Sequence, residues 1–455
     1  MNKITLSIIL SLIICPIITF GANPIIGDGT ADPHMKVWNN KVYLSVGKDQ
    51  SPLNKTCLMP YWRIFSSTNL IDWTLESTIL PSNTYLGEGS LSCWATDITM
   101  RNGVYYFYFS NGGSNSGVLR ASSPKGPWED VLKKPLIGVA GTNTHDYDPS
   151  ILVDDDGQQY IVTGLDGNLQ GKTLNHYKIA KLNSDMISLS EMPRDLITSE
   201  PYGFGGITKA QDHNYIHKYN GLYYLACDVR YETSTNIYGP YTNRRLSGTV
   251  AGHGSVCEYN GQWYKTFDSE DARYNARTYR VANMTYVHYK DNGDMLYDLN
   301  FQTGGKYYST GVGNYDAAWP QIEAEWFFKI SGATKNDSPE GDFEIQNIKA
   351  NDYLNFPNIK NVPANATINF RISSGNKAKG QIEVRKDSPD GKLLGTCKIQ
   401  NTGSWTSYKT VPCQLTNSAG NANLYFVFKG VGSELVRLNW FSITNSTARL
   451  VENKK

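Results

Sequence analysis

Five copies of one turn-and-strand pattern limit this chain to a fold of repeated small β-sheets. Each copy has a pair of turn residues, one or two spacer residues and then aromatic strand residues, and the turns begin at Asn40, Asn102, Asp156, Asn220 and Asn260. Asn-Gly and Asp-Gly pairs favour hairpins because both residues adopt positive φ. The turns lie 40 to 64 residues apart, which leaves room for several short strands in each unit. Five such units predict a five-bladed β-propeller.

A titratable residue precedes each copy at nearly the same position. It stands 9 to 12 residues before the aromatic residues of the strand, at Asp32, Asp97, Asp148, Asp212 and His253. In a propeller, the strand before such a hairpin is the innermost strand of its blade, so equivalent positions converge on the central axis. Charges on a solvated face would be scattered instead. The spacing therefore predicts four carboxylates and one imidazole in a shared funnel.

Converging carboxylates suggest general acid and base chemistry. Like charges in a partly dry site raise one another's pKa and so separate their protonation states. Hydrolysis of a glycosidic bond uses this arrangement, because one carboxylic acid protonates the leaving oxygen while a carboxylate activates water. The 12% of aromatic residues agrees with a sugar ligand, since sugar rings stack on Tyr and Trp. A site for a hard cation, built from the same carboxylates, is the competing interpretation.

The first 21 residues predict export. Residues 1–21 combine Lys3 with a short apolar run and end in small residues, which is typical of a signal peptide cleaved after Gly21. We therefore expect a periplasmic or secreted protein, with a lipoprotein modified on Cys15 as the alternative. No later apolar run approaches the ~20 residues that a membrane-spanning helix needs.

Removal of this segment would change the net charge and the number of cysteines. Without Lys3 the chain has 42 basic and 42 acidic residues, which gives no support to a nucleic-acid-binding role. Six cysteines remain, and an oxidising compartment permits disulfides. Cys397 and Cys413 are the most plausible local pair, whereas the other four could be paired or could be buried thiols.

Several motifs keep their order and spacing over about residues 23 to 300. They are Asn23-Pro24-Ile25-Ile26, Ala31-Asp32-Pro33, Ser66-Ser67-Thr68-Asn69-Leu70-Ile71-Asp72-Trp73, Trp94-Ala95-Thr96-Asp97, Asp148-Pro149-Ser150 and Gly252-His253-Gly254-Ser255-Val256. This stretch resembles glycoside hydrolase family 43. The resemblance implies a five-bladed β-propeller that hydrolyses pentosides with inversion, mostly β-xylosides and α-L-arabinofuranosides. It also implies that Asp32 is the general base, that Asp148 orients the acid and holds its pKa up, and that His253 lies in the axial channel near a calcium or other ion.

The position of the general acid departs from the family pattern. In the segment that resembles Glu-x-x-x-x-x-Lys-x-Asn-Gly-x-Tyr-Tyr-Leu, residues 218–225 match, but Asp212 stands in place of Glu. The shorter side chain withdraws the carboxyl by about 1.5 Å, and a displacement of that size costs about 10²-fold in rate. We expect Asp212 to donate the proton in a reshaped site. The alternatives are His213 as the donor, a recruited Glu such as Glu200 or Glu232, or a pocket that binds sugar without cleaving the usual bond.

Four further residues are candidates for contact with the substrate. They are Trp94, Tyr147, His213 and Arg277. The aromatic residues could equally be packed in the fold, and Arg277, which follows the fifth hairpin, could bind a sugar hydroxyl or an anionic substituent, or pair with a nearby carboxylate such as Glu270.

A second β-rich region follows a seam at Asn314–Pro320. Short alternating runs over residues 321–446 predict a β-sandwich of the jelly-roll type. Its segments at 322–325, 388–391, 402–405 and 438–441 resemble carbohydrate-binding module family 6. The resemblance implies a structural calcium on Glu323 and Glu325, with Asn439 where the family has Asp, and sugar-clasping aromatic residues at Phe356 and Trp405. A purely structural appendage is the alternative.

Together these features predict an exported glycoside hydrolase. Residues 1–21 would be the signal peptide, 22–313 the propeller and 321–446 the sandwich. The expected activity is release of terminal pentose units from a plant or algal polysaccharide, without an organic cofactor or a protein partner. The alternatives are hydrolysis of another linkage, such as an algal galactan or anhydro-sugar unit, and a non-catalytic glycan-binding protein that reuses the funnel.

Overall fold

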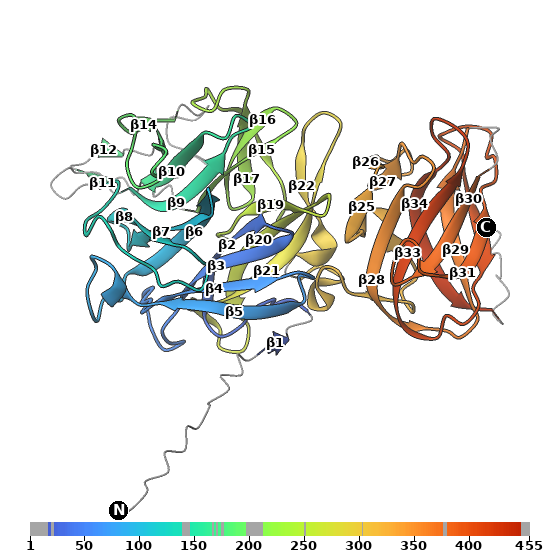
Figure 1. Ribbon diagram of the computed structural model, residues 1–455, viewed down its shortest axis with the longest axis horizontal. Helices are drawn as coiled ribbons and strands as arrows, with labels where there is room; N and C mark the ends of the chain where they lie inside the picture. Colours follow the sequence, from blue (N-terminus) through green and yellow to red (C-terminus); the bar gives the residue numbers. More distant parts are fainter. Residues whose placement is uncertain are drawn as a thin grey trace, which may run out of the picture.

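The chain is an all-β protein in two bodies that lie side by side (Figure 1). The structure is a computed structural model that describes residues 17–19, 22–138, 146–165, 168–169, 172–173, 177–196, 213–249, 252–302, 304–375 and 380–446. Helix is limited in these residues to four single turns of 3-10 type: η1 (Pro81–Asn83), η2 (Leu299–Phe301), η3 (Tyr308–Thr310) and η4 (Ala324–Trp326). None of the helices described is long and apolar enough to cross a membrane.

Among the described residues, the first body contains five antiparallel sheets of three or more strands, each opened by one of the predicted hairpins, and one two-stranded sheet. The first sheet has β2 (Thr30–Trp38), β3 (Lys41–Lys48), β4 (Trp62–Ser67) and β5 (Asp72–Ile79), with β1 (Ile17–Thr19) paired to β5. The second has β6 (Cys93–Arg101), β7 (Val104–Asn111) and β8 (Asn115–Ala121). The third has β9 (Asp146–Val153), β10 (Gln159–Leu165), β13 (Lys178–Lys181) and β14 (Arg194–Asp195), and the short strands β11 (Asn168–Leu169) and β12 (Lys172–Thr173) pair separately.

The fourth and fifth sheets have four strands each. The fourth has β15 (Asn214–Tyr219), β16 (Leu222–Cys227), β17 (Arg230–Ser234) and β18 (Thr242–Leu246), and the fifth has β19 (Val256–Tyr259), β20 (Gln262–Asp271), β21 (Ala276–Tyr289) and β22 (Met295–Tyr297). The turn residues Asn102, Asn220 and Asn260 and the glycines after them have positive φ, between 46° and 81°. The predicted hairpins are therefore confirmed, with the turn geometry that Asn-Gly favours.

The first strands of the five sheets lie next to one another. β2, β6, β9, β15 and β19 make contacts in this order, and β19 returns to contact β2. An isolated bridge between Ile26 and Ala282 also joins the segment before β2 to β21 of the fifth sheet. The residues that open these five strands are consequently brought to one central region.

The second body is a sandwich of two six-stranded sheets. One sheet has β23 (Tyr315–Asp316), β25 (Lys329–Ser331), β28 (Tyr353–Val362), β33 (Gly420–Gly430), β30 (Gly380–Lys386) and β31 (Lys392–Lys398). The other has β24 (Ile322–Glu323), β26 (Thr334–Asp337), β27 (Phe343–Gln346), β34 (Arg437–Asn445), β29 (Ala366–Ser373) and β32 (Tyr408–Gln414). Aromatic side chains fill the space between the sheets; the rings of Phe426 and Phe441, for example, are 4.8 Å apart.

One apolar cluster runs from the fifth sheet into the sandwich. Trp326 is 2% exposed at this junction, and its indole N–H donates to Asp298 at 2.6 Å. Lys335 of β26, which is partly buried, donates to the side chain of Gln262 in β20 at 2.6 Å and to the carbonyl of Val287 in β21 at 2.9 Å. Apolar packing and polar contacts thus both join the two bodies.

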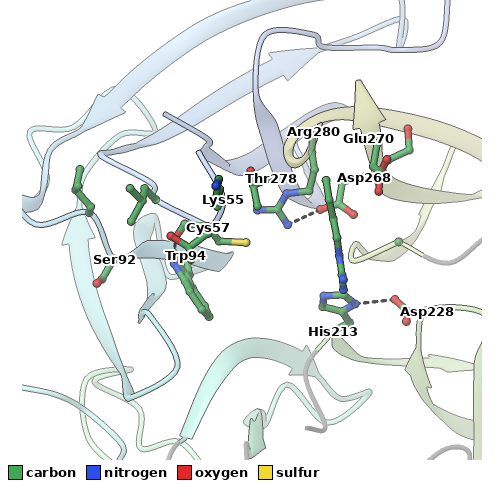
Figure 2. Close-up of a pocket in the computed structure, with 16 residues that line it drawn as sticks. Lys55, Cys57, Ser92, Trp94, His213, Asp228, Asp268, Glu270, Thr278 and Arg280 are labelled. Atoms are coloured by element: carbon green, nitrogen blue, oxygen red, sulfur yellow. Dashed lines mark hydrogen bonds and ion pairs between the residues drawn. The ribbon is translucent and has the colours of Figure 1, made fainter. Parts of the chain in front are cut away.

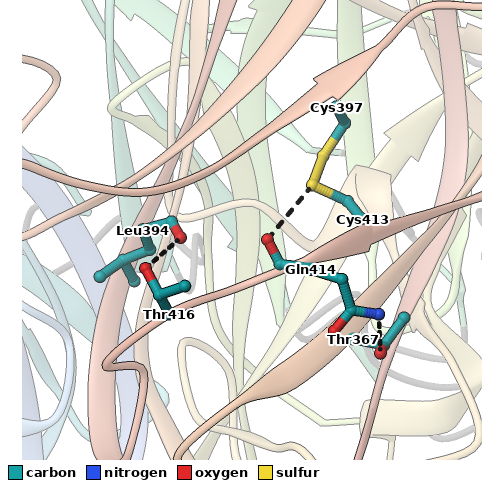
Figure 3. Close-up of a disulfide and its surroundings, with 6 residues drawn as sticks. All are labelled: Thr367, Leu394, Cys397, Cys413, Gln414 and Thr416. Atoms are coloured by element: carbon teal, nitrogen blue, oxygen red, sulfur yellow. Dashed lines mark hydrogen bonds between the residues drawn. A yellow bond between two sulfur atoms is a disulfide. The ribbon is translucent and has the colours of Figure 1, made fainter. Parts of the chain in front are cut away.

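The predicted disulfide between Cys397 and Cys413 is confirmed. Figure 3 shows it between β31 and β32, which are consecutive in the chain but form the edges of opposite sheets of the sandwich. Thr416 and Leu394 make a hydrogen bond at 3.2 Å close by. The disulfide therefore joins the two sheets at one edge.

Loss of this disulfide is expected to destabilise the sandwich. The closed loop spans a sequence separation of 16, so replacement of both cysteines by Ser should lower the free energy of unfolding by about 3 kcal/mol. Urea denaturation followed by tryptophan fluorescence measures this change. A reducing agent should lower the midpoint of the wild type to the same level and leave the double variant unchanged; an unaltered midpoint in the double variant would contradict the prediction.

Candidate active site

Three residues that open inner strands have an unusual backbone conformation. Asp32, Asp148 and His213 have φ of 52°, 52° and 60°, a left-handed conformation that L-residues seldom adopt. The pairing of β2 with β3 shifts register beside Asp32, which marks a bulge there. Such a bulge redirects a side chain out of the regular alternation of the strand. In this way the sheets turn equivalent side chains toward the central region.

The main-chain N–H of each of these residues is held by a side chain of a neighbouring sheet. The N–H of Asp148 donates to Ser110 at 2.8 Å, that of His213 donates to Oδ2 of Asp148 at 2.9 Å, and that of Asp32 donates to Oδ2 of Asp268 at 3.1 Å. A hydrogen bond to a charged group is worth about 1.5–3 kcal/mol. The local left-handed conformations therefore depend on contacts between sheets.

His253 joins two of the predicted carboxylates. Its Nδ1 lies 3.2 Å from Oδ1 of Asp32 and 3.9 Å from Oδ2 of Asp148. All three side chains are almost fully buried. Asp32, Asp148 and His253, which are more than a hundred residues apart in sequence, thus meet at one point as their spacing predicted.

Asp97 does not contact His253 directly but is connected to it through His34. Its Oδ1 is 3.9 Å from Nδ1 of His34, and Nε2 of His34 is 3.2 Å from Nε2 of His253. Asp97 also makes an ion pair with Lys36 at 3.0 Å and accepts the N–H of Ile151 at 2.7 Å. The prediction that Asp97 shares the funnel is corrected: its side chain is fully enclosed and ties inner strands together.

Arg280 was not found by sequence reasoning, and it holds the carboxylate of Asp32. Its Nη1 donates to Oδ1 of Asp32 at 2.8 Å and to Oδ2 of Asp268 at 2.9 Å, while its Nη2 donates to Asp49 at 2.9 Å. Burial by itself would raise the pKa of Asp32, but Arg280 and His253 outweigh it and hold this pKa well below its usual range. Asp32 is consequently ionised at neutral pH.

A pocket of about 1190 Å³ opens directly above these groups. Figure 2 shows Arg280 and Asp268 on one side of it, with His213 and Asp228 below them, and Trp94 on the other side. Asp32 and Asp148 are not among its described lining residues. They touch residues that are, through Arg280 for Asp32 and through the N–H of His213 for Asp148.

His213 is paired with a second residue that the repeat did not reveal. Its Nδ1 lies 2.8 Å from Oδ1 of Asp228, and both residues line the pocket (Figure 2). Burial opposes ionisation of Asp228, yet His213 lowers the pKa of Asp228 to about 2. The imidazole ring also stacks on that of His253, with 4.8 Å between ring centroids. This pairing fixes the orientation of the ring and directs its other nitrogen away from Asp228.

The remaining predicted substrate contacts divide into two groups. Trp94 and Arg277 line the pocket with His213, and the indole N–H of Trp94 donates to the carbonyl of Cys57 at 3.1 Å. Tyr147 is 3% exposed, with its ring 6.5 Å from that of Trp94, and it does not belong to the described lining. Asp212, the predicted acid, lies outside the described residues and precedes His213 directly in the sequence. Glu200 also lies outside the described residues.

Both ring nitrogens of His253 face other side chains. Its Nδ1 faces Asp32 and its Nε2 faces His34, each at 3.2 Å, so neither ring nitrogen is open. Across the described part of the chain, moreover, no three His, Cys, Asp or Glu side chains are grouped as a metal site. The placement of a metal ion at His253 therefore stays a prediction.

The glutamates of the sandwich do fit a hard cation. Burial raises the pKa of Glu323 to about 7, and burial together with the charge of Glu323 raises the pKa of Glu325 well above its usual range. Oε2 of Glu325 is buried without a hydrogen-bond partner. Glu323 and Asn439 line one shared pocket, where the amide of Asn439 donates to Glu340 at 3.0 Å. Two repelling carboxylates with an unsatisfied oxygen are a donor set suited to calcium.

The predicted sugar-clasping pair of the sandwich is only half supported. Phe356 is fully buried and packs against Tyr315, Phe426 and Phe441, so it offers no face to a ligand and its prediction is wrong. Trp405 is partly exposed, and the guanidinium of Arg437 lies 5.2 Å from the centre of its ring. Arg437 thus occupies one side of the aromatic surface that a sugar would need.

The sequence matches two family descriptions in the expected order. Glycosyl hydrolases family 43 matches residues 21–295, and Carbohydrate binding module (family 6) matches residues 323–445. An arabinoxylan arabinofuranohydrolase of Paenibacillus polymyxa is 28% identical and aligns over 92% of this chain and 73% of its own. A second arabinoxylan arabinofuranohydrolase, from Bacillus subtilis, is 26% identical over 90% of both chains.

A solved structure is similar in fold over most of this chain. It is a glycoside hydrolase family 43 arabinoxylan arabinofuranohydrolase from Bacillus subtilis in complex with cellotetraose, with a TM-score of 0.53 and 23% identity. The alignment covers 93% of this chain and 98% of that one. At this identity the likeness concerns the fold.

Proposed function

Because the chain belongs to glycosyl hydrolases family 43 over residues 21–295, we propose that it removes terminal pentose units, of the α-L-arabinofuranoside or β-xyloside type, from a polysaccharide. The observation that carries the proposal is the meeting of Asp32 and Asp148 at His253, directly beneath an open pocket. Two relatives that align over 90% or more of the chain are arabinoxylan arabinofuranohydrolases. Arabinose side units of an arabinoxylan are therefore the first substrate to test.

The proposed reaction is a single displacement with inversion. Asp32, kept ionised by Arg280, takes a proton from water as the water oxygen attacks the anomeric carbon. The C–O bond to the leaving sugar breaks, its electron pair stays on the leaving oxygen, and Asp212 gives that oxygen a proton. Asp148 accepts the N–H of His213, the residue after Asp212, and would in this way position the donor.

We further propose the arrangement of the chain around this site. Residues 22–313 would form a five-bladed propeller, which the cyclic contacts of β2, β6, β9, β15 and β19 support. Residues 321–446 would form the sandwich module, and residues 1–21 a signal peptide that directs the enzyme to the periplasm or the medium. Calcium would be held in the sandwich by Glu323, Glu325 and Asn439, where it would neutralise the two buried carboxylates.

Product analysis on a panel of polysaccharides tests this function. Wheat arabinoxylan, linear arabinan, xylo-oligosaccharides and an agar-type galactan would be incubated with the full chain, and the sugars released separated by chromatography. We expect free arabinose from arabinoxylan, with the xylan backbone left intact. Release of galactose or anhydro-sugar products would assign another linkage, and binding without release of any sugar would assign a non-catalytic role.

A further inference from the structure

We propose that Asp268 of β20 is a positioning residue for catalysis, which fixes the carboxylate of Asp32 in the direction of the attacking water. It would do so through Arg280 and through the main chain on both sides of the site. The proposal rests on the proposed function, because it assumes that Asp32 is the general base. Asp268 belongs to none of the repeat positions that predicted the site.

Asp268 accepts three N–H groups with two oxygens. Its Oδ1 accepts the main-chain N–H of His253 at 3.0 Å, and its Oδ2 accepts both the N–H of Asp32 at 3.1 Å and Nη1 of Arg280 at 2.9 Å. The Asp268 side chain is 6% exposed and lines the pocket. A single carboxylate thus fixes the backbone of two predicted site residues and the guanidinium that touches the base.

These contacts determine which oxygen of Asp32 can act. Arg280 and His253 both bind Oδ1, at 2.8 and 3.2 Å. In the part of the chain that is described, the side-chain contacts of Asp32 all converge on this oxygen, which leaves Oδ2 for a water molecule. The left-handed φ of 52° at Asp32 fixes the direction of the side chain, and the hydrogen bond from its N–H to Asp268 stabilises that conformation.

Arg280 depends on Asp268 for its place between two carboxylates. Its Nε and Nη2 are bound to Asp49, at 3.1 and 2.9 Å, so one end of the guanidinium is anchored away from the pocket. Only Nη1 reaches Asp32, and the same nitrogen reaches Asp268. Removal of the negative charge at Asp268 would leave Asp49 and Asp32 to compete for the guanidinium, and the base would lose its fixed geometry.

The change Asp268→Asn isolates this role. Asn is the same size but has one acceptor oxygen, so it cannot accept from His253 on one side and from Asp32 and Arg280 on the other. Its amide would point at a donor in either orientation. We expect kcat on an aryl arabinofuranoside to fall about 100-fold, because a misplacement of about 1 Å costs that much, while KM stays within about threefold.

A double-mutant cycle separates positioning from a direct role. If Asp268 acts through Asp32, the variant Asp32→Asn/Asp268→Asn should be no slower than Asp32→Asn alone, within about twofold. The matched control is Asp271→Asn on the same strand, which loses the pair with Arg273 outside the described pocket lining and should keep kcat. The thermal midpoint of each variant, followed by circular dichroism, shows whether it folds.

Three results would overturn the proposal. They are an unchanged kcat in Asp268→Asn, a further loss of similar size when the change is added to Asp32→Asn, and a failure to fold of both Asp268→Asn and Asp268→Ser. The second result would make Asp268 a direct participant, and the third would assign it to the fold. Failure of the proposed function looks different, because the wild-type enzyme would then release no arabinose from the aryl arabinofuranoside. Failure of the base assignment alone would leave Asp32→Asn fully active whatever residue 268 is.

Discussion

Replacement of Asp32 by Asn is expected to lower kcat on an aryl arabinofuranoside by about 10²- to 10⁴-fold, the usual contribution of a general base. The amide cannot accept the proton of water as a carboxylate does. Arg280 and His253, which hold Oδ1 at 2.8 and 3.2 Å, would still fix the side chain, so KM should change little. Initial rates at saturating substrate measure the effect.

The control for this prediction is Asp154→Asn. Asp154 is a partly buried carboxylate that binds Lys218 at 2.6 Å and Tyr223 at 2.6 Å and is not among the described residues of the pocket. Its variant should keep the kcat of the wild type. Equal losses in the two variants would mean that the effect of Asp32→Asn reflects folding rather than chemistry, and an active Asp32→Asn enzyme would exclude this residue as the base.

We expect the proton donor to be identified by how strongly the rate loss of its variant depends on the leaving group of the substrate. Asp212→Asn should lower kcat by about 10²- to 10⁴-fold on arabinoxylan, whose leaving sugar oxygen needs a proton. With a 2,4-dinitrophenyl leaving group, which departs without protonation, the same variant should lose far less. Comparison of the two substrates for each variant therefore identifies a general acid independently of effects on binding.

His213→Gln is the matched variant for this comparison. His213 is held by Asp228 at 2.8 Å and stacks on His253, so its loss should affect both substrates by a similar factor through the shape of the pocket. Asp228→Asn, which removes its partner, should behave in the same way. A dependence on the leaving group that appears in His213→Gln but not in Asp212→Asn would make the imidazole the donor and contradict our assignment.

Local turn chemistry explains why much of the fold could be predicted. Asn-Gly pairs determine a hairpin within a few residues, so each repeat predicted the first two strands of a sheet. Equivalent positions in successive sheets then brought Asp32 and Asp148 together, although 116 residues separate them by their numbering. The family resemblance added the order of the motifs. The disulfide was predictable because its cysteines are only 16 positions apart in the sequence.

Two of the residues that were missed come from the long fifth hairpin, and Asp228 comes from the turn between β16 and β17. Arg280 lies on β21 and Asp268 on β20, beyond the phase at which the repeat places its titratable residue. Their contacts with Asp32 depend on how the fifth sheet packs against the first. No local sequence pattern predicts that packing. The sequence does show a concentration of charged residues at that hairpin, which could have indicated a site. It does not show which of these side chains point inward. They are Asp268, Glu270, Asp271, Arg273, Arg277 and Arg280.

The error at Phe356 came from the family resemblance, which placed a sugar-contacting aromatic residue at this position. Leu354 and Phe356 are two residues apart in the regularly paired part of β28, and both are fully buried. Alternation along the strand therefore places Phe356 in the interior. Phe356 faces the interior, where the rings of Phe426 and Phe441 lie 5.2 and 4.8 Å away. Asp97 is a second error: it stands at the repeat position, but its carboxylate makes an ion pair with Lys36.

The anomeric form of the first sugar released tests the central claim most directly. The claim is that Asp32, next to the pocket, directs one water molecule at the anomeric carbon in a single displacement. Proton NMR during the first minutes of hydrolysis of an aryl α-L-arabinofuranoside should show the β-anomer of arabinose appearing first, before mutarotation. Initial formation of the α-anomer, or no release of arabinose at all, would contradict the account.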